Sequence, residues 1–304
     1  MSHTEEIEDS SAPLIEHLAE LRTRLIRAVM AFLVGMIVCF TFGGQILDFL
    51  LIPIENTMRE LGNPNPVMQY TAPQEYFFTL IRISMVGGLA LSFPVIGYQL
   101  WRFVAPGLYK NEKNAFLPFL IASPALFLLG ASFAHLVVVP LAMAFFLGFA
   151  DLPSYLAALV GNGDVPAAGT AVKDSGIDIV FNGKVNETLD ITLKMIVAFG
   201  LCFQLPVLLT LMGKAGLVNA EGLGNVRKYA VVGILLLAAL VTPPDVITQL
   251  ILFVVVYGLY EISIFLVSRV DKKREAKLRE EGFYDDEEAE DLADIEEDPE
   301  NNGK

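Results

Sequence analysis

Long apolar runs separated by short polar segments are the main pattern of this chain. A helix needs about 20 apolar residues to cross a hydrocarbon layer about 30 Å thick. The runs predict an all-α, polytopic membrane protein with six spans, at about residues 25–44, 77–101, 116–139, 190–212, 229–242 and 246–267. The fifth run covers only about 21 Å at about 1.5 Å per residue. We expect the last two spans to be short, since Glu261 interrupts the sixth, and the third to end near Pro140.

Basic residues near the ends of the runs predict the orientation, because cytoplasmic loops carry an excess of Lys and Arg. With six spans, four basic groups fall on one side, and only Arg59, Lys173 and Lys184 lie in the opposite loops. Both termini are therefore expected in the cytoplasm. The four groups are Arg22, Arg24 and Arg27; Arg102, Lys110 and Lys113; Lys214, Arg227 and Lys228; and the cluster from Arg269 to Arg279.

Composition agrees with a membrane protein, because 54% of the 304 residues are hydrophobic, 18% are charged and the mean hydropathy is +0.54. The formal charge of −14 comes from the two ends. Residues 1–16 contribute −5 and residues 275–304 contribute −11, so the rest of the chain is near +2. We interpret 1–16 and 271–304 as acidic solvated tails, the second disordered, around a core of residues 17–270.

Candidate chemistry inside the runs is sparse. Cys39 and Cys202 lie in apolar runs, and no metal-binding, nucleotide-binding or hydrolase motif occurs, so we expect no cofactor, no metal and no enzyme. His135 is interpreted as an interhelical hydrogen-bond former rather than a proton relay, and Arg82 and Lys194 as residues that reach outward to water. Glu261, near the inner end of the sixth run, is placed to pair with Arg269. A small-molecule or ion transporter is the alternative function, but transporters often carry repeated halves, and no repeat is evident.

The first motif is HLAELRTRL at residues 17–25, whose spacing predicts a helix with one apolar and one polar stripe. The simplest interpretation is an interfacial helix that starts near Ser11 or Pro13 and pairs its acids with its own arginines. Anionic lipid disfavours acids directly before a membrane span, which leaves open that Glu20 binds an incoming cation. The apolar stripe is Leu18, Leu21 and Leu25, and the polar stripe is Glu16, Glu20 and Arg24.

The second motif is the aromatic and charged segment Gln99–Glu112 between the second and third runs. An aromatic belt with basic anchors explains most of it. Glu112 lies on the same predicted side as Glu20, and two carboxylates can accept two guanidinium groups through forked hydrogen bonds. Lysine lacks the planar fork. In the fourth run, Gln204 has two open interpretations, which are a functional role and satisfaction of backbone groups freed by Pro206.

Three segments in this order resemble the TatC family, the membrane receptor of the twin-arginine protein translocase. They are HLAELRTRL (17–25), F-x-x-P-G-L-Y-x-x-E (103–112) and LVTPPDV (240–246), and the resemblance extends over about residues 14–270. It implies a glove-shaped six-helix protein of the cytoplasmic (inner) membrane that binds Arg-Arg signal peptides of folded proteins. It also implies single-span partners TatA and TatB, self-association, use of the proton-motive force, and no nucleic acid.

The resemblance assigns roles to particular positions. Signal-peptide binding falls on Glu20 and Glu112, flanked by Leu21, Arg22, Phe103 and Tyr109. Partner-helix docking or structural polar roles fall on Pro53, in an outer loop, and on Gln204 and Asp245. Many family members carry Glu where this chain has Gln204. The loop 151–189, with a β-like patch at 177–181, is longer than is usual in the family.

Overall fold

The computed structural model describes residues 3–60, 63, 65–104, 117–149, 183–243 and 245–280. Within these residues the regular secondary structure is helical apart from two strands of two residues each, with short turns and connections between the elements. It divides into two units, Met1–Gln204 with Val231–Tyr257, and Leu205–Ala230 with Gly258–Lys304. The sequence motifs at Tyr109, Glu112 and residues 177–181 lie outside the described residues.

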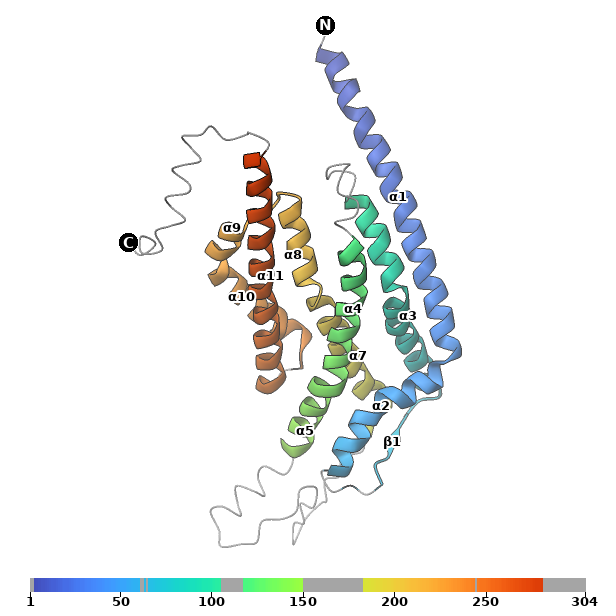
Figure 1. Ribbon diagram of the computed structural model, residues 1–304. Coiled ribbons are helices and arrows are strands. Elements are labelled where there is room, and N and C mark those ends of the chain that lie inside the picture. The colour runs from blue at the N-terminus through green and yellow to red at the C-terminus, as the bar shows by residue number, and fades with distance from the viewer. Residues whose placement is uncertain are drawn as a thin grey trace, which may run out of the picture. The chain divides into compact units, whose positions relative to one another are not determined.

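Helices α1 (His3–Thr41) and α3 (Pro73–Val104) run side by side in opposite directions within the first unit (Figure 1). Glycines allow them to touch through the main chain. A Cβ atom on Gly35 would lie 2.8 Å from the carbonyl oxygen of Gly88, and one on Gly88 would lie 2.6 Å from the backbone nitrogen of Met36. Small residues at such crossings let membrane helices approach closely. This contact fixes the register of α1 against α3.

Helix α2 (Gly43–Glu60) follows α1 and was not predicted. Its buried apolar residues, Leu47, Leu50, Ile54 and Met58, recur at helical spacing and form one face. That face explains how α2 packs against α3, α5 and α7. The periodicity was visible in the sequence, but the segment is too polar for a span.

The third apolar run forms one continuous helical path through α4 (Leu117–Phe133), a π-helical turn η3 (Ala134–Val138) and α5 (Val139–Phe149). The helix therefore continues past Pro140, where we predicted the span to end, and the position at which the span leaves the membrane stays a prediction. Pro140 is the second residue of α5, a position where a missing N–H is tolerated, and it follows the wide π turn. Ala142 and Met143 beyond it are buried, and α5 packs against α2.

Helix α7 (Val185–Cys202) begins earlier than the predicted span at 190 and ends before Gln204. Strand β1 (Met68–Gln69) pairs in parallel with β2 (Gly183–Lys184), so the connection before α3 is attached to the start of α7. Helices α4 and α7 pack closely, because a Cβ on Gly130 would lie 2.5 Å from the carbonyl oxygen of Phe199. Phe127 and Phe199 are fully buried, and they mark the core of this unit.

The second unit contains α8 (Leu205–Lys214), α9 (Ala220–Asn225), the start of α10 (Arg227–Val241) and the later part of α11 (Val246–Glu280). The Tyr260 hydroxyl donates to the carbonyl oxygen of Leu223 at 2.8 Å. Arg227 makes a forked pair with Glu261, with Nε–Oε1 at 2.8 Å and Nη2–Oε2 at 3.0 Å. The predicted pairing of Glu261 with Arg269 is therefore wrong, since the Arg269 guanidinium lies over the Phe265 ring instead.

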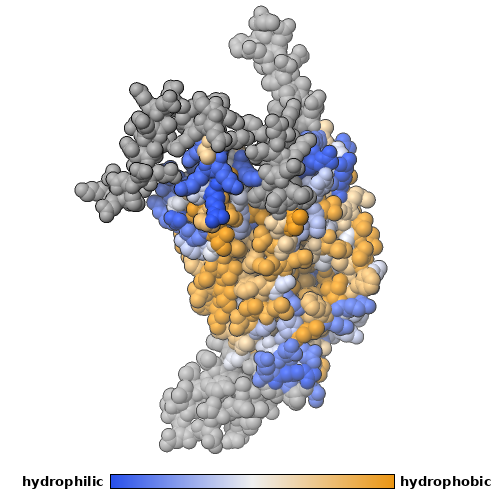
Figure 2. Space-filling view, viewed as in Figure 1, coloured by the Kyte–Doolittle hydropathy of each residue, from blue (hydrophilic) through white to orange (hydrophobic). Residues whose placement is uncertain are grey.

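Five helical segments are long and apolar enough to cross a membrane: Ala19–Thr41, Pro73–Leu100, Ile121–Gly148, Val185–Lys214 and Val246–Ala276. The surface visible in Figure 2 carries apolar residues over the middle of the helices and hydrophilic residues near their ends. The fifth predicted span, at about residues 229–242, corresponds to α10, which has only 15 residues. The chain is thus an all-α, multi-pass membrane protein, as predicted, while crossing by α10 and the concave shape stay predictions.

The helices at both ends extend further than predicted. Helix α1 begins at His3 rather than near Ser11 or Pro13, and α11 continues to Glu280. The first ten residues of the predicted tail 271–304 are therefore helical. Alternating Lys, Arg, Glu and Ala residues after Asp271 favour this continuation, because they are strong helix formers.

Candidate functional site

Glu20, the first predicted signal-binding acid, lies on α1 and is paired with Arg24 one turn further along the helix. The Arg24 guanidinium donates a hydrogen bond to Oε1 of Glu20. Arg24 is buried, whereas the Glu20 side chain is 38% exposed. The simple interpretation that acids of this motif pair with their own arginines is confirmed for Glu20. A carboxylate has about four acceptor positions, so this one can accept a second guanidinium group.

Leu21 and Leu25 of the apolar stripe face outward. Leu21 is 39% exposed and Leu25 is 60% exposed, while Arg24 on the polar stripe is buried. This arrangement reverses that of a helix on a soluble protein and suits a helix whose outer surface meets lipid. Arg22, a further predicted site residue two positions after Glu20, is exposed.

Phe103 lies in the last turn of α3, and the register of α3 against α1 brings it to the level of Glu20. Glu20 and Phe103 each lie fifteen residues from the Gly35–Gly88 contact, and the two helices run in opposite directions. Equal steps along both helices cover equal distances, at about 1.5 Å per residue. Glu20 and Phe103, far apart in sequence, therefore share one end of the α1–α3 pair. Tyr109 and Glu112 belong to the undescribed segment that follows.

Gln204 lies at the break between α7 and α8 and joins α7 to α4. The Ser123 hydroxyl donates to Oε1 of Gln204 at 2.7 Å, and Nε2 of Gln204 donates to the Ser123 carbonyl oxygen at 2.9 Å. Gln204 thus has a structural role, as one of the two interpretations predicted. The group that it satisfies is the Ser123 carbonyl oxygen of α4 rather than a backbone group freed by Pro206.

Asp245 and Pro53 hold structural positions. Asp245 is 2% exposed and caps the start of α11, because its Oδ1 accepts from the backbone N–H of Thr248 at 2.7 Å and its Oδ2 accepts from the Thr248 hydroxyl. Pro53 is buried inside α2 rather than in a loop, and its carbonyl oxygen accepts from the Thr57 hydroxyl at 2.9 Å.

His135 lies in the π turn, where it is buried and stacks against Phe49 of α2, with ring centroids 4.7 Å apart. Among the described residues its Nδ1 atom has no hydrogen-bond partner. The interhelical contact that the described residues show is therefore aromatic, and Nδ1 does not make the predicted interhelical hydrogen bond there.

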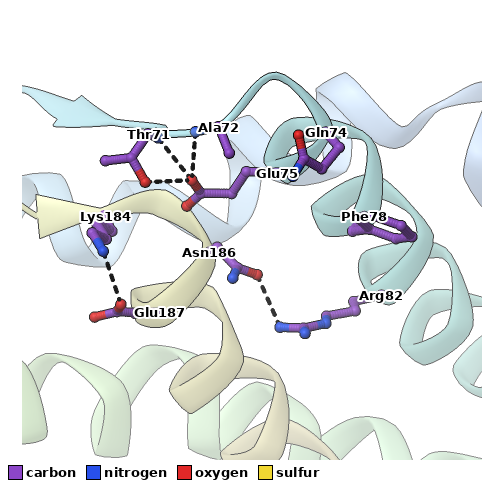
Figure 3. A pocket seen from close by; sticks show the side chains of 9 residues that line it. All are labelled: Thr71, Ala72, Gln74, Glu75, Phe78, Arg82, Lys184, Asn186 and Glu187. Carbon is purple, nitrogen blue, oxygen red and sulfur yellow. Dashed lines mark hydrogen bonds and ion pairs between the residues drawn. The ribbon is translucent and has the colours of Figure 1, made fainter.

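The sequence analysis missed an open polar pocket of about 290 Å³ between the start of α3 and the start of α7 (Figure 3). Nη1 of Arg82 donates to Asn186 at 2.9 Å and lies 3.5 Å from Asp190, whose other oxygen lies 2.6 Å from Nζ of Lys194. Arg82 and Lys194 thus meet a carboxylate rather than reaching outward singly. The i, i+4, i+8 spacing of Asn186, Asp190 and Lys194 was the available signal. The lining residues are Thr71, Ala72, Gln74, Glu75, Phe78, Arg82, Lys184, Asn186 and Glu187.

Charged residues that line this pocket are already paired with neighbouring groups of the protein. The Glu75 carboxylate accepts from the backbone N–H groups of Thr71 at 2.7 Å and Ala72 at 3.3 Å, and Nζ of Lys184 lies 3.4 Å from Glu187. These contacts are local to the start of α3 and the start of α7, and the contacts of Arg82 with Asn186 and Asp190 join the two helices. Across the described ranges, no group of three His, Cys, Asp or Glu side chains is placed to hold a metal ion.

Comparison with known proteins identifies the family. Residues 16–254 match the family model described as Sec-independent protein translocase protein (TatC). A TatC protein of Magnetococcus marinus is 41% identical over 88% of this chain and 88% of its own length, and one of Aquifex aeolicus is 38% identical over 86% and 97%. A crystal structure described as the twin-arginine translocase receptor TatC is 36% identical, with a TM-score of 0.66 over 84% of this chain and 99% of that one. The chain therefore belongs to the TatC family of Sec-independent protein translocase proteins.

Proposed function

We propose that this chain is the signal-peptide receptor of a twin-arginine translocase and binds the Arg-Arg motif of folded export substrates at the cytoplasmic face. Family membership makes it a protein-transport component in a multi-pass membrane protein family, working in a Tat complex with other subunits, and not an enzyme. The observation that carries the proposal is the half-exposed Glu20 carboxylate at the level of Phe103.

In this proposal Glu20 and Glu112 each bind one guanidinium group of the signal peptide. Forked, charge-assisted hydrogen bonds between arginine and carboxylate contribute about 1.5–3 kcal/mol each. Phe103 and Tyr109 supply aromatic contacts beside the arginines, and exposed Leu21 supplies an apolar one. Arg22, which is exposed and basic, discourages ligands whose positive charge is not directed at the acids.

A second step in the proposal moves the apolar part of the signal into a concave interior. Single-span helices of TatA and TatB then assemble near Gln204 and the hairpin 229–267, driven by the proton-motive force, with further copies of this chain in the complex. Support comes from α10, where Leu236 is 63% exposed and Leu240 is 77% exposed, so its apolar surface is available to a partner helix.

The proposed orientation places both termini in the cytoplasm of a cell with this chain in its inner membrane. Five crossings would separate the termini, whereas six bring them to one side, so the crossing of α10 decides the topology. Single cysteines near His3 and near Lys273, in a variant without Cys39 and Cys202, test this with a membrane-impermeant thiol reagent in inverted vesicles. Labelling of only one of the two sites would contradict the proposal.

The binding test compares an Arg-Arg signal peptide with its Lys-Lys counterpart on the purified protein in nanodiscs. The only tryptophan of the chain, Trp101, lies two residues before Phe103 and serves as a fluorescence reporter. We expect preference for Arg-Arg, lost in Glu20→Gln and in Glu112→Gln. A matched control is Glu55→Gln, since Glu55 pairs with Arg59 at the same i, i+4 spacing on α2.

Equal binding of both peptides by the wild-type protein, with partner subunits absent and present, would refute the receptor proposal. In cells, the double variant Glu20→Ala, Glu112→Ala should fail to export twin-arginine substrates. Normal export by that variant would refute the role of the two acids.

A further inference from the structure

Two buried polar atoms beside the Glu20 site have no hydrogen-bond partner among the described residues. They are Nη1 of Arg24 on α1 and Oε1 of Gln99 on α3. Arg24 is 9% exposed and Gln99 is 8% exposed. Each residue lies eleven positions from the Gly35–Gly88 contact, so the two side chains belong to the same level of the antiparallel pair.

The two atoms are chemically complementary. A guanidinium group carries only donors, and an amide oxygen accepts. Leaving either atom buried without a partner is unfavourable, and a charged donor suffers most. In the structure the guanidinium of Arg24 is instead engaged with Glu20 through Nη2. The ion pair with Glu20 therefore holds Arg24, while Oε1 of Gln99 has no hydrogen-bond partner among the described residues.

We propose that Arg24 is a positioning residue that occupies Glu20 in the resting protein and transfers to Gln99 when a guanidinium group of the ligand takes its place. This inference rests on the proposed function of Glu20. The exchange keeps Glu20 paired with an arginine throughout. It also gives the orphaned oxygen of Gln99 a charged donor, so part of the cost of displacing Arg24 is recovered.

The exchange also affects selectivity. An incoming group must replace a resident guanidinium, and the planar fork of arginine matches the carboxylate better than an ammonium group does. A lysine of the ligand should therefore displace Arg24 from Glu20 less readily than an arginine does. The Arg-Arg preference of the site is then a property of Arg24 and Gln99 together with the carboxylates.

The first test measures peptide binding by Gln99→Met, which removes the acceptor and keeps an unbranched side chain. Since a hydrogen bond to a charged group is lost from the bound state only, the Arg-Arg peptide should bind about tenfold more weakly. The matched control is Gln74→Met at the opposite, exposed end of α3, which should bind as the wild type does. Gln99→Leu serves as a second variant with a different shape.

The second test uses Arg24→Gln, which removes the resident cation and leaves a neutral hydrogen-bonding side chain. We expect the ratio of Lys-Lys to Arg-Arg affinity to rise, because neither peptide has to displace a guanidinium group. The control Arg27→Gln removes the same charge from an exposed position one turn away and should leave that ratio unchanged. In the Arg24→Gln background, Gln99→Met should no longer weaken binding.

The outcomes separate the two proposals. If the wild-type protein binds both peptides equally, the receptor function fails and this inference fails with it. If the wild type prefers Arg-Arg but the Arg24 and Gln99 variants match their controls, or their effects simply add, the exchange alone is refuted. Elution as a single species and an unchanged far-UV circular dichroism spectrum confirm that each variant is folded.

Discussion

Replacing Gly88 by valine should separate α1 from α3. A Cβ atom at this position would lie 2.6 Å from the nitrogen and 2.7 Å from the Cα of Met36. Both atoms belong to the main chain of α1, so no flexible side chain can move aside. The helices themselves must shift, or the variant must give up the contact.

The size of the effect follows from overpacking. Inserting side-chain atoms into a packed interior costs about 1–3 kcal/mol. Membrane helices gain their association from close packing rather than from apolar burial, so a lost close contact is not compensated elsewhere. We expect a loss of about 2 kcal/mol in the free energy of unfolding, or roughly a 30-fold change in the folded-to-unfolded ratio.

The assay is a reversible unfolding titration in mixed micelles of SDS and a nonionic detergent, followed by circular dichroism. The matched control is Gly258→Val, since a Cβ on Gly258 meets nothing within 4 Å. The two variants share the same change in helix propensity, so their difference isolates the contact. Signal-peptide affinity should also fall in Gly88→Val, because Glu20 and Phe103 depend on the same register.

The reasoning would be refuted if Gly88→Val and Gly258→Val were equally stable. Such a result would mean that α1 and α3 do not touch through their main chains. The placement of Glu20 and Phe103 at the same level of the α1–α3 pair would then lose its support as well.

Three further predictions concern other contacts. Gln204→Leu removes both hydrogen bonds to Ser123 and should lower the free energy of unfolding by about 1–3 kcal/mol in the same titration; an unchanged midpoint would show that the link carries no stability. Asp245→Ala should cost about 0.5–2 kcal/mol through loss of the helix cap, whereas Asp245→Asn, which keeps an acceptor, should cost less; equal losses in the two variants would argue against capping. Arg227→Lys loses the fork to Glu261 but keeps the charge, and because both side chains are at least a third exposed we expect a loss below about 1 kcal/mol, measured by the same method; a larger loss would show that the pair is more shielded from water than described.

The sequence predicted the fold class because apolar run length reports membrane crossing directly. It failed where a partner from elsewhere in the chain decides the outcome. Pro140 was predicted to end the third span because no local feature of the sequence indicates the π turn that precedes it. Glu261 was assigned to Arg269 on the same helix, whereas its partner Arg227 comes from α10.

The candidate site shows the same division. The pairing of Glu20 with Arg24 was visible as an i, i+4 spacing. The sequence alone did not show that Phe103 and Gln99 lie at the same level of the α1–α3 pair as Glu20 and Arg24. That alignment depends on the register that Gly35 and Gly88 impose. Gln99 was noticed only as the first residue of a loop motif, and its burial opposite Arg24 emerges from the packing of α1 against α3.

The Gln204–Ser123 link has a consequence for proton coupling. Gln204 accepts through one atom and donates through the other, which is the hydrogen-bonding pattern of a protonated glutamic acid. A glutamate here, as the family resemblance leads one to expect, would keep both bonds only while it held its proton, and would release the Ser123 carbonyl on ionising. An amide has no proton to lose in this range. In this chain both hydrogen bonds between Gln204 and Ser123 are therefore independent of pH. If the translocase responds to a proton gradient, residues other than Gln204 must bind and release the proton.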